Sequence, residues 1–231
     1  MISLQAVQFR YEAMLMNFDL AVAKGEIVAV IGPSGAGKST LLSLIAGFET
    51  PLSGRIAIAG RDMGGMAPDL RPINMIFQDH NSFAHLDVWT NVALGVSPRL
   101  SLNAAEEALV DAALDRVGLL PYRSRKPTEI SGGEKQRIAI ARALVRDKPV
   151  LLLDEPFTAL GPALRRDMLD LVMGIREERD LTVLMVTHQP EDARYAAGRI
   201  AFVEAGRITH LLATEAFFAD TAPVEIRAYL A

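Results

Sequence analysis

The segment Gly32-Pro-Ser-Gly-Ala-Gly37-Lys38-Ser39 has the spacing of a phosphate-binding loop. Its glycines allow backbone N–H groups to surround a phosphate without clashes from Cβ atoms. Lys38 would bridge the β- and γ-phosphate oxygens of a nucleotide, and the Ser39 hydroxyl would ligate Mg²⁺. A plain glycine-rich turn is the alternative, which the strand–loop–helix context disfavours. The predicted phosphate site comprises Gly32, Pro33, Ser34, Gly35, Ala36, Gly37, Lys38, Ser39 and Thr40.

A pair of carboxylates, Asp154 and Glu155, ends the apolar run Val150–Leu153. At the end of a strand the second side chain can turn into the same cleft as the first. Asp154 would then hold Mg²⁺ through water, and Glu155 would polarise a water molecule that attacks the nucleotide. A solvated turn or helix start is the alternative for such a pair by itself. Its combination with a phosphate loop favours the catalytic interpretation.

A third motif, Ser131-Gly132-Gly133-Glu134, has Ser and Glu at the spacing of a capping box. Two glycines in the first turn of a helix leave its N–H groups accessible, and such a helix end binds anions readily. The motif can therefore serve as a helix cap and as an anion site at once.

Buried strands must position these motifs. Ile27–Ile31 is continuously apolar and rich in branched residues, as in a strand covered on both faces. Helical spacing resumes in Ser39–Ala46 after the glycines. Val150–Leu153 and Thr182–Val186 read as two further buried strands, and the helical stretch Met168–Ile175 between them gives a βαβ pattern.

Shorter alternating segments at Leu4–Phe9, Phe18–Val22, Arg55–Ala59 and Ile73–Phe77 predict an antiparallel sheet, and the residues around Glu204-Ala-Gly206 predict a hairpin. Residues 79–148 have mostly helical patterns, with a capping arrangement at Asn103-Ala-Ala-Glu106. The expected fold is α/β: a phosphate-loop NTPase core with a mostly parallel sheet, an N-terminal antiparallel β region and an inserted helical subdomain. We expect one domain over residues 1–231, with the helical subdomain at about 79–148 inserted in a RecA-like core.

The composition is that of a globular protein, since 50% of the 231 residues are hydrophobic and 23% are charged. The formal net charge of −4 argues against a nucleic-acid partner. The absence of cysteine excludes disulfides and thiolate metal sites. The N-terminus lacks the pattern of a signal peptide, and no apolar run is long enough to span a bilayer. We therefore expect a soluble, cytoplasmic protein, in which any membrane role would have to come through a partner.

The glycine motif at 131–134 continues as Lys135-Gln136-Arg137-Ile-Ala-Ile-Ala-Arg142, and with this continuation nearly the whole chain resembles the ATP-binding subunits of ABC transporters. The resemblance implies ATP and Mg²⁺ as cofactors and a head-to-tail dimer of two copies. In that dimer, the segment Ser131, Gly132, Gly133 and Glu134 of one copy would meet the γ-phosphate held by the other.

The resemblance also assigns individual residues. Tyr11 matches an aromatic that stacks on adenine, although a plain strand aromatic is the alternative. Gln78 matches a glutamine that touches Mg²⁺ and the attacking water. His188, directly after a core strand, matches a histidine that contacts the γ-phosphate. The expected catalytic residues are therefore Glu155, His188 and Gln78, and the expected metal ligands are Ser39, Gln78 and Asp154.

Three positions depart from the family pattern. Glu134 and Ile130 replace the more usual Gln and Leu, and Gly161 replaces an Asp. Gly caps a helix almost as well as Asp, so Gly161 should hardly affect stability. The family's Asp also communicates across the dimer, so the departure at Gly161 bears on coupling between the two ATP sites.

Among short members of the family, the chain is most similar to the ATPases of bacterial thiamine importers, in stretches such as Asn91-Val-Ala-Leu-Gly95 and Pro127-Thr-Glu-Ile-Ser131. That resemblance implies transmembrane permease subunits as partners, a periplasmic solute-binding protein as an indirect partner, and a peripheral place on the cytoplasmic face of the inner membrane. Phe83, Leu86 and Trp89 could line the permease docking groove, or they could pack the helical insertion. Two alternatives stay open. One is the ATPase of an importer for a metal ion, polyamine or anion, and the other is a soluble non-transport ABC ATPase.

Overall fold

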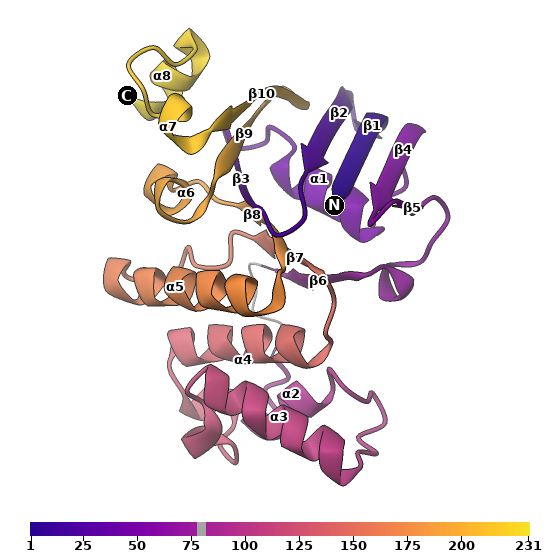
Figure 1. Cartoon of the computed structure of the whole chain (residues 1–231), viewed down its shortest axis with the longest axis vertical. Coiled ribbons are helices and arrows are strands. Elements are labelled where there is room, and N and C mark those ends of the chain that lie inside the picture. The colour runs from indigo at the N-terminus through magenta and orange to yellow at the C-terminus, as the bar shows by residue number, and fades with distance from the viewer. Residues whose placement is uncertain (78–81) are drawn as a thin grey trace. The chain divides into compact units, whose positions relative to one another are not determined.

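A computed structural model of the protein describes residues 1–77 and 82–231. The chain forms two compact units, which we describe separately (Figure 1). The first comprises Met1–Ile73, Pro149–Glu155 and Met173–Ala231, and the second comprises Asn74–Lys148 and Pro156–Val172. The expectation of a helical subdomain inserted over residues 79–148 stays a prediction.

The first unit is built on a mixed sheet, whose strands follow the order β5-β4-β1-β2-β10-β9-β3-β8-β7-β6. Antiparallel pairing joins β1 to β2 and to β4, and β4 to β5. The strands β9, β3, β8 and β7 are parallel to one another, and β9 forms an antiparallel hairpin with β10. The strands span β1 (Ile2–Tyr11), β2 (Met14–Val22), β3 (Ile27–Ile31), β4 (Ser53–Ile58), β5 (Arg61–Asp62), β6 (Ile73–Ile76), β7 (Val150–Asp154), β8 (Thr182–Val186), β9 (Arg199–Glu204) and β10 (Arg207–Ala213).

The mixed sheet confirms the expected fold class, and the hairpin at residues 204–206 is also confirmed. The expectation for Ile73–Phe77 was wrong. Strand β6 begins on the last residue of the first unit and lies next to β7, at the opposite end of the strand order from the antiparallel β1, β2 and β4. A strand of four residues does not specify its neighbour, because strand pairing is decided by contacts far away in the sequence.

Helices of the first unit include α1 (Lys38–Ala46), which follows β3 directly, and α6 (Pro190–Ala196), which follows β8. Near the C-terminus lie α7 (Thr214–Phe217) and α8 (Val224–Leu230), with a 3-10 turn at Pro68–Leu70 elsewhere. Strands β3 and β8 are buried along their whole length. This burial fixes the carboxyl ends of β3, β7 and β8, and those ends carry the candidate site residues.

The second unit contains α2 (Val88–Ala93), α3 (Ala104–Arg116) and α4 (Gly132–Val145), which pack against one another (Figure 1). Short 3-10 turns lie at Leu120–Tyr122 and Pro127–Glu129, and α5 (Pro162–Arg179) begins in this unit and ends in the first. The expected capping box forms at the start of α3, where Asn103 and Glu106 satisfy each other's backbone N–H groups. Gly118 follows α3 with a left-handed φ of 71°, as expected of a glycine that ends a helix.

Candidate nucleotide site

The loop between β3 and α1 wraps around the amino group of Lys38. Its Nζ atom donates to the carbonyl oxygens of Gly32 and Pro33, each at 2.8 Å, and the side chain is buried. A Cβ atom on Gly32 would lie 1.9 Å from the carbonyl oxygen of Val203, so only glycine fits where the loop leaves the strand. Burial lowers the pKa of Lys38, while the nearby Glu155 and Asp154 act in the opposite direction. The ammonium group is therefore held by the loop at the N-terminal end of α1.

The end of β7 lies beside the start of α1. The Ser39 hydroxyl donates to Oδ1 of Asp154 at 3.0 Å. Burial raises the pKa of Asp154, with a further increase from the charge of Glu155, while the Ser39 hydrogen bond and Lys38 lower it. A desolvated carboxylate next to a second carboxylate and a hydroxyl is a set of oxygen donors with excess negative charge, which suits a hard divalent cation.

Glu155 and His188 form a second pair in the first unit. Nδ1 of His188 lies 3.0 Å from Oε2 of Glu155. Glu155 has a left-handed backbone with φ of 47°, and its N–H donates to the carbonyl oxygen of Val186 at 3.1 Å. Such a backbone costs of the order of 1–3 kcal/mol and persists only when its surroundings enforce it. Here the bond to the end of β8 turns the carboxylate out of the strand direction, toward the histidine that follows β8.

The first turn of α4, in the second unit, is organised by Ser131 and Glu134. The Ser131 hydroxyl accepts from the Glu134 N–H at 3.3 Å and donates to Oε2 of Glu134 at 2.7 Å, and the same carboxylate oxygen accepts from the Ser131 N–H at 2.7 Å. These hydrogen bonds to Ser131 lower the pKa of Glu134, and Arg125 and Arg137 lower it further. The capping box predicted from the sequence is therefore present. Gly132 borders open space where its side chain would be.

Known proteins resemble the chain along nearly its full length. The profile of the ABC transporter family matches residues 15–158. The chain belongs to the ABC transporter family.

It is 52% identical over 229 residues to the thiamine import ATP-binding protein ThiQ of Mesorhizobium japonicum, covering 99% of this chain and 90% of the relative. ThiQ of Vibrio cholerae is 50% identical over 208 residues, covering 90% of this chain and 87% of that protein.

Two solved structures have the same fold. One is a dimeric ATP-binding cassette in a post-hydrolysis state bound to ADP and Pi, with a TM-score of 0.81 and 29% identity, covering 93% of this chain and 99% of the other. The second is cbiO1 of Clostridium perfringens, part of an ABC transporter complex, with a TM-score of 0.86 and 27% identity over 95% of this chain and 90% of that one. The expected resemblance is confirmed, and the chain is an ABC-type ATPase.

Within this ABC fold, the structure brings together Lys38, Ser39, Asp154, Glu155 and His188 in the first unit. Tyr11 ends β1 with 57% of its surface exposed, which leaves its ring accessible. Gln78 lies outside the described residues. The second unit contains the segment Ser131, Gly132, Gly133 and Glu134. The contact of this segment with the γ-phosphate bound by a second copy stays a prediction.

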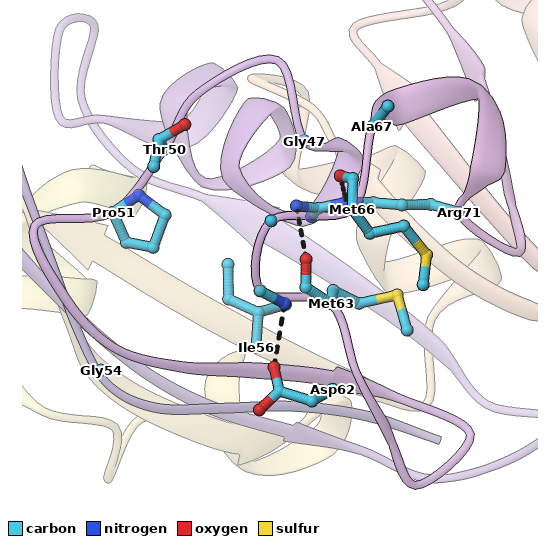
Figure 2. Close-up of a pocket in the computed structure, with 12 residues that line it drawn as sticks. Gly47, Thr50, Pro51, Gly54, Ile56, Asp62, Met63, Met66, Ala67 and Arg71 are labelled. Carbon is cyan, nitrogen blue, oxygen red and sulfur yellow. Dashed lines mark hydrogen bonds between the residues drawn. The ribbon is translucent and has the colours of Figure 1, made fainter.

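Sequence reasoning missed Arg71, which is buried at the far end of α1. Its guanidinium donates to the carbonyl oxygens of Leu44 and Ile45 in the last turn, at 2.8 and 2.7 Å. It also donates to the carbonyl oxygens of Met63 and Met66, as Figure 2 shows. A cation at a helix C-terminus complements the helix dipole, so Arg71 stabilises the helix whose other end carries the phosphate loop.

The pocket in Figure 2, about 250 Å³ in volume, adjoins Arg71 and the end of α1. A helix of nine residues is about 13 Å long, so this pocket lies well away from the phosphate loop. It is therefore distinct from the candidate nucleotide site.

The turn of the β9–β10 hairpin provides a second support that the sequence did not reveal. The Gly206 N–H donates to the carbonyl oxygen of Ala36 in the phosphate loop at 3.0 Å, and the Gly206 carbonyl accepts from the Asn17 N–H at 2.8 Å. The glycine itself was recognised as part of a hairpin, but its contact with the loop joins residues that are distant in sequence. The phosphate loop is thus bonded to the hairpin turn, and the hairpin turn is bonded in turn to β2.

Proposed function

We propose that this chain is the ATP-hydrolysing subunit of a thiamine importer, working as a head-to-tail dimer on the cytoplasmic face of the bacterial inner membrane. The observation that carries the proposal is the 52% identity over 229 residues with a relative named as a thiamine import ATP-binding protein. No helix in the described part of the chain is long and apolar enough to cross a membrane. Transport in this proposal therefore requires transmembrane permease subunits, and a periplasmic binding protein delivers the solute to them.

The first unit supplies the catalytic residues. Lys38, whose Nζ atom already lies among loop carbonyls, would exchange those contacts for β- and γ-phosphate oxygens of ATP. Tyr11 would stack on the adenine, and the backbone N–H groups of residues 32–40 would surround the β-phosphate. Gly206 and Arg71 would keep the loop and its helix in place during turnover.

Ser39 and Asp154 would hold Mg²⁺, because their oxygens are adjacent and the buried carboxylate favours a cation beside it. Gln78 would be a third ligand. When bound, the ion neutralises the charge that develops on the phosphates.

Glu155 would take a proton from the attacking water. His188 would hold the Glu155 carboxylate in position and contact the γ-phosphate. The first turn of α4 from the second copy, Ser131 to Glu134, would complete the site on the opposite side of the γ-phosphate.

The substrate is tested in a complex of this chain with its permease and solute-binding protein in liposomes. We expect thiamine-loaded binding protein to stimulate ATP hydrolysis, while polyamine-loaded or iron-loaded homologues do not. Phe83→Asp should abolish that stimulation and spare basal hydrolysis by the isolated subunit, because the Phe83 side chain is 45% exposed in the segment where we expect the permease to dock. Stimulation by another solute's binding protein, and none by the thiamine protein, would overturn the assignment of thiamine.

A further inference from the structure

Asn91 of α2 is completely buried and uses its whole side-chain amide in hydrogen bonds. Its Nδ2 atom donates to the carbonyl oxygens of Phe83, Leu86 and Asp87 at 3.0, 3.2 and 2.9 Å. Its Oδ1 atom accepts from the Phe83 N–H at 2.8 Å. One buried side chain therefore fixes both ends of the segment 83–87, which has no regular secondary structure of its own.

Arg142 connects the same asparagine to α4. Its Nε atom donates to the Asn91 carbonyl oxygen and its Nη2 atom donates to Oδ1 of Asn91, each at 2.9 Å. The guanidinium also lies over the Phe83 ring, 5.4 Å from the ring centre. A planar, two-point arrangement of this kind fixes orientation as well as distance, and a lysine cannot reproduce it.

The contacts join two parts of the second unit with different environments. Phe83, at one end, is 45% exposed. At the other end, α4 begins with the Ser131–Glu134 turn, and Arg142 lies further along the same helix. Asn91 is buried and Arg142 is half-buried, and a hydrogen-bonded network of this kind rigidifies the parts that it joins. Displacement of segment 83–87 should therefore act on α4.

We propose that Asn91 and Arg142 are positioning residues that transmit movement between segment 83–87, as the docking site of the permease, and the first turn of α4, as the part that meets the second copy's ATP. This inference rests on the proposed function. Because coupling between two binding sites is reciprocal, nucleotide bound at the first turn of α4 must also act on segment 83–87, even without a permease.

Hydrogen exchange on the isolated subunit gives the first test. In a Glu155→Gln background, which should trap the ATP-bound dimer, Mg²⁺–ATP should change amide exchange in residues 82–87. The change should persist in Arg146→Lys, a matched control in which an exposed arginine one turn beyond Arg142 is replaced. It should disappear in Arg142→Lys and Asn91→Asp, although these variants bind ATP. A nucleotide-dependent change that survives in both variants, or that is absent from the parent protein, would overturn the inference.

ATP hydrolysis in the reconstituted complex gives the second test. The ratio of stimulated to basal hydrolysis should fall about 2- to 30-fold in Asn91→Asp and Arg142→Lys, the range for residues that mediate coupling without touching a ligand. Basal hydrolysis and the KM for ATP should match those of Arg146→Lys. An unchanged ratio, or a parallel loss of basal and stimulated hydrolysis, would contradict the inference, since the latter marks a merely structural role. A wild-type complex that shows no stimulation would instead refute the proposed docking, and the exchange experiment is independent of that result.

Discussion

Glu155 has the most specific geometry of the candidate catalytic residues, because its left-handed backbone and its contact with His188 both direct the carboxylate. Glu155→Gln keeps the size of the side chain but removes the group that accepts a proton. ATP binding should persist while hydrolysis slows about 10²–10⁴-fold, the usual contribution of an oriented general base. Size-exclusion chromatography should then show ATP-dependent dimers. Glu215→Gln, an exposed carboxylate on α7, serves as the control, and near-normal hydrolysis by Glu155→Gln would remove Glu155 from this role.

Asp154 should lower the stability of the nucleotide-free protein. Burial raises its pKa above the ordinary value of 3.8, so the folded state retains the proton more strongly than the unfolded chain does. The stability that the folded state gains by holding this proton is complete below pH 3.8. It is lost as pH rises through the folded pKa, where the buried carboxylate becomes charged. Asp154→Asn should therefore raise the Tm near neutral pH, by roughly 2–4 °C if the gain is about 1 kcal/mol. The gain should shrink toward zero below pH 4, and the variant should lose the further stabilisation that Mg²⁺–ATP gives the wild type. A constant gain at every pH would rule out this explanation.

At the scale of elements, two glycines differ sharply in what their surroundings allow. Gly161 precedes α5 and has no atom within 4 Å of an added Cβ, whereas the same atom on Gly32 would clash with the backbone of Val203. Gly161→Asp should thus change the free energy of unfolding by only a few tenths of a kcal/mol. Gly32→Ala should cost about 1–3 kcal/mol or more and disrupt ATP binding. Chemical denaturation measures both effects, and a large destabilisation by Gly161→Asp would contradict the open environment at that helix cap.

Gly161→Asp also separates an effect on folding from an effect on coupling between the two ATP sites. Gly161→Asp introduces the residue that the family resemblance implies at this position, so we expect altered cooperativity of ATP hydrolysis with little change in stability. An unchanged Hill coefficient and an unchanged transport-coupled rate would show that Gly161 is neutral.

Elements whose causes are local could be predicted from the sequence, and contacts between distant elements could not. The strand–loop–helix at residues 27–46 and the capping boxes at Asn103 and Ser131 depend on neighbouring residues, and they form as expected. Arg71 bonds to Leu44, 27 residues away, and Arg142 bonds to Asn91, 51 residues away. No spacing rule in a single sequence identifies such partners, and the neighbour of β6 was misassigned for the same reason.

At the scale of the whole molecule, Lys38 and Ser131 belong to different compact units of one chain, and in the proposed dimer they serve different nucleotides. A Lys38→Ala homodimer and a Ser131→Arg homodimer each carry one defect in both ATP sites. Lys38→Ala should weaken nucleotide binding itself, and Ser131→Arg should block closure around the γ-phosphate. Both homodimers should therefore lose hydrolysis, and full activity of the Ser131→Arg homodimer would refute the shared site.

Mixing the two variants places both defects in one composite site of the heterodimer and leaves the other site intact. If one intact site is enough, the mixture should recover hydrolysis that neither variant has alone. At equal concentrations and with random pairing, about half of the dimers are heterodimers with one intact site each, so at most about a quarter of all sites should be active. If both sites must hydrolyse ATP, the mixture should stay inactive. A heterodimer purified through two different affinity tags decides between these outcomes. The Lys38→Ala, Ser131→Arg double variant paired with wild type is the matched control, because it carries one defect in each composite site and should stay inactive. Hydrolysis by the double-variant pairing that matches or exceeds that of the single-variant pairing would contradict the composite sites that head-to-tail assembly requires.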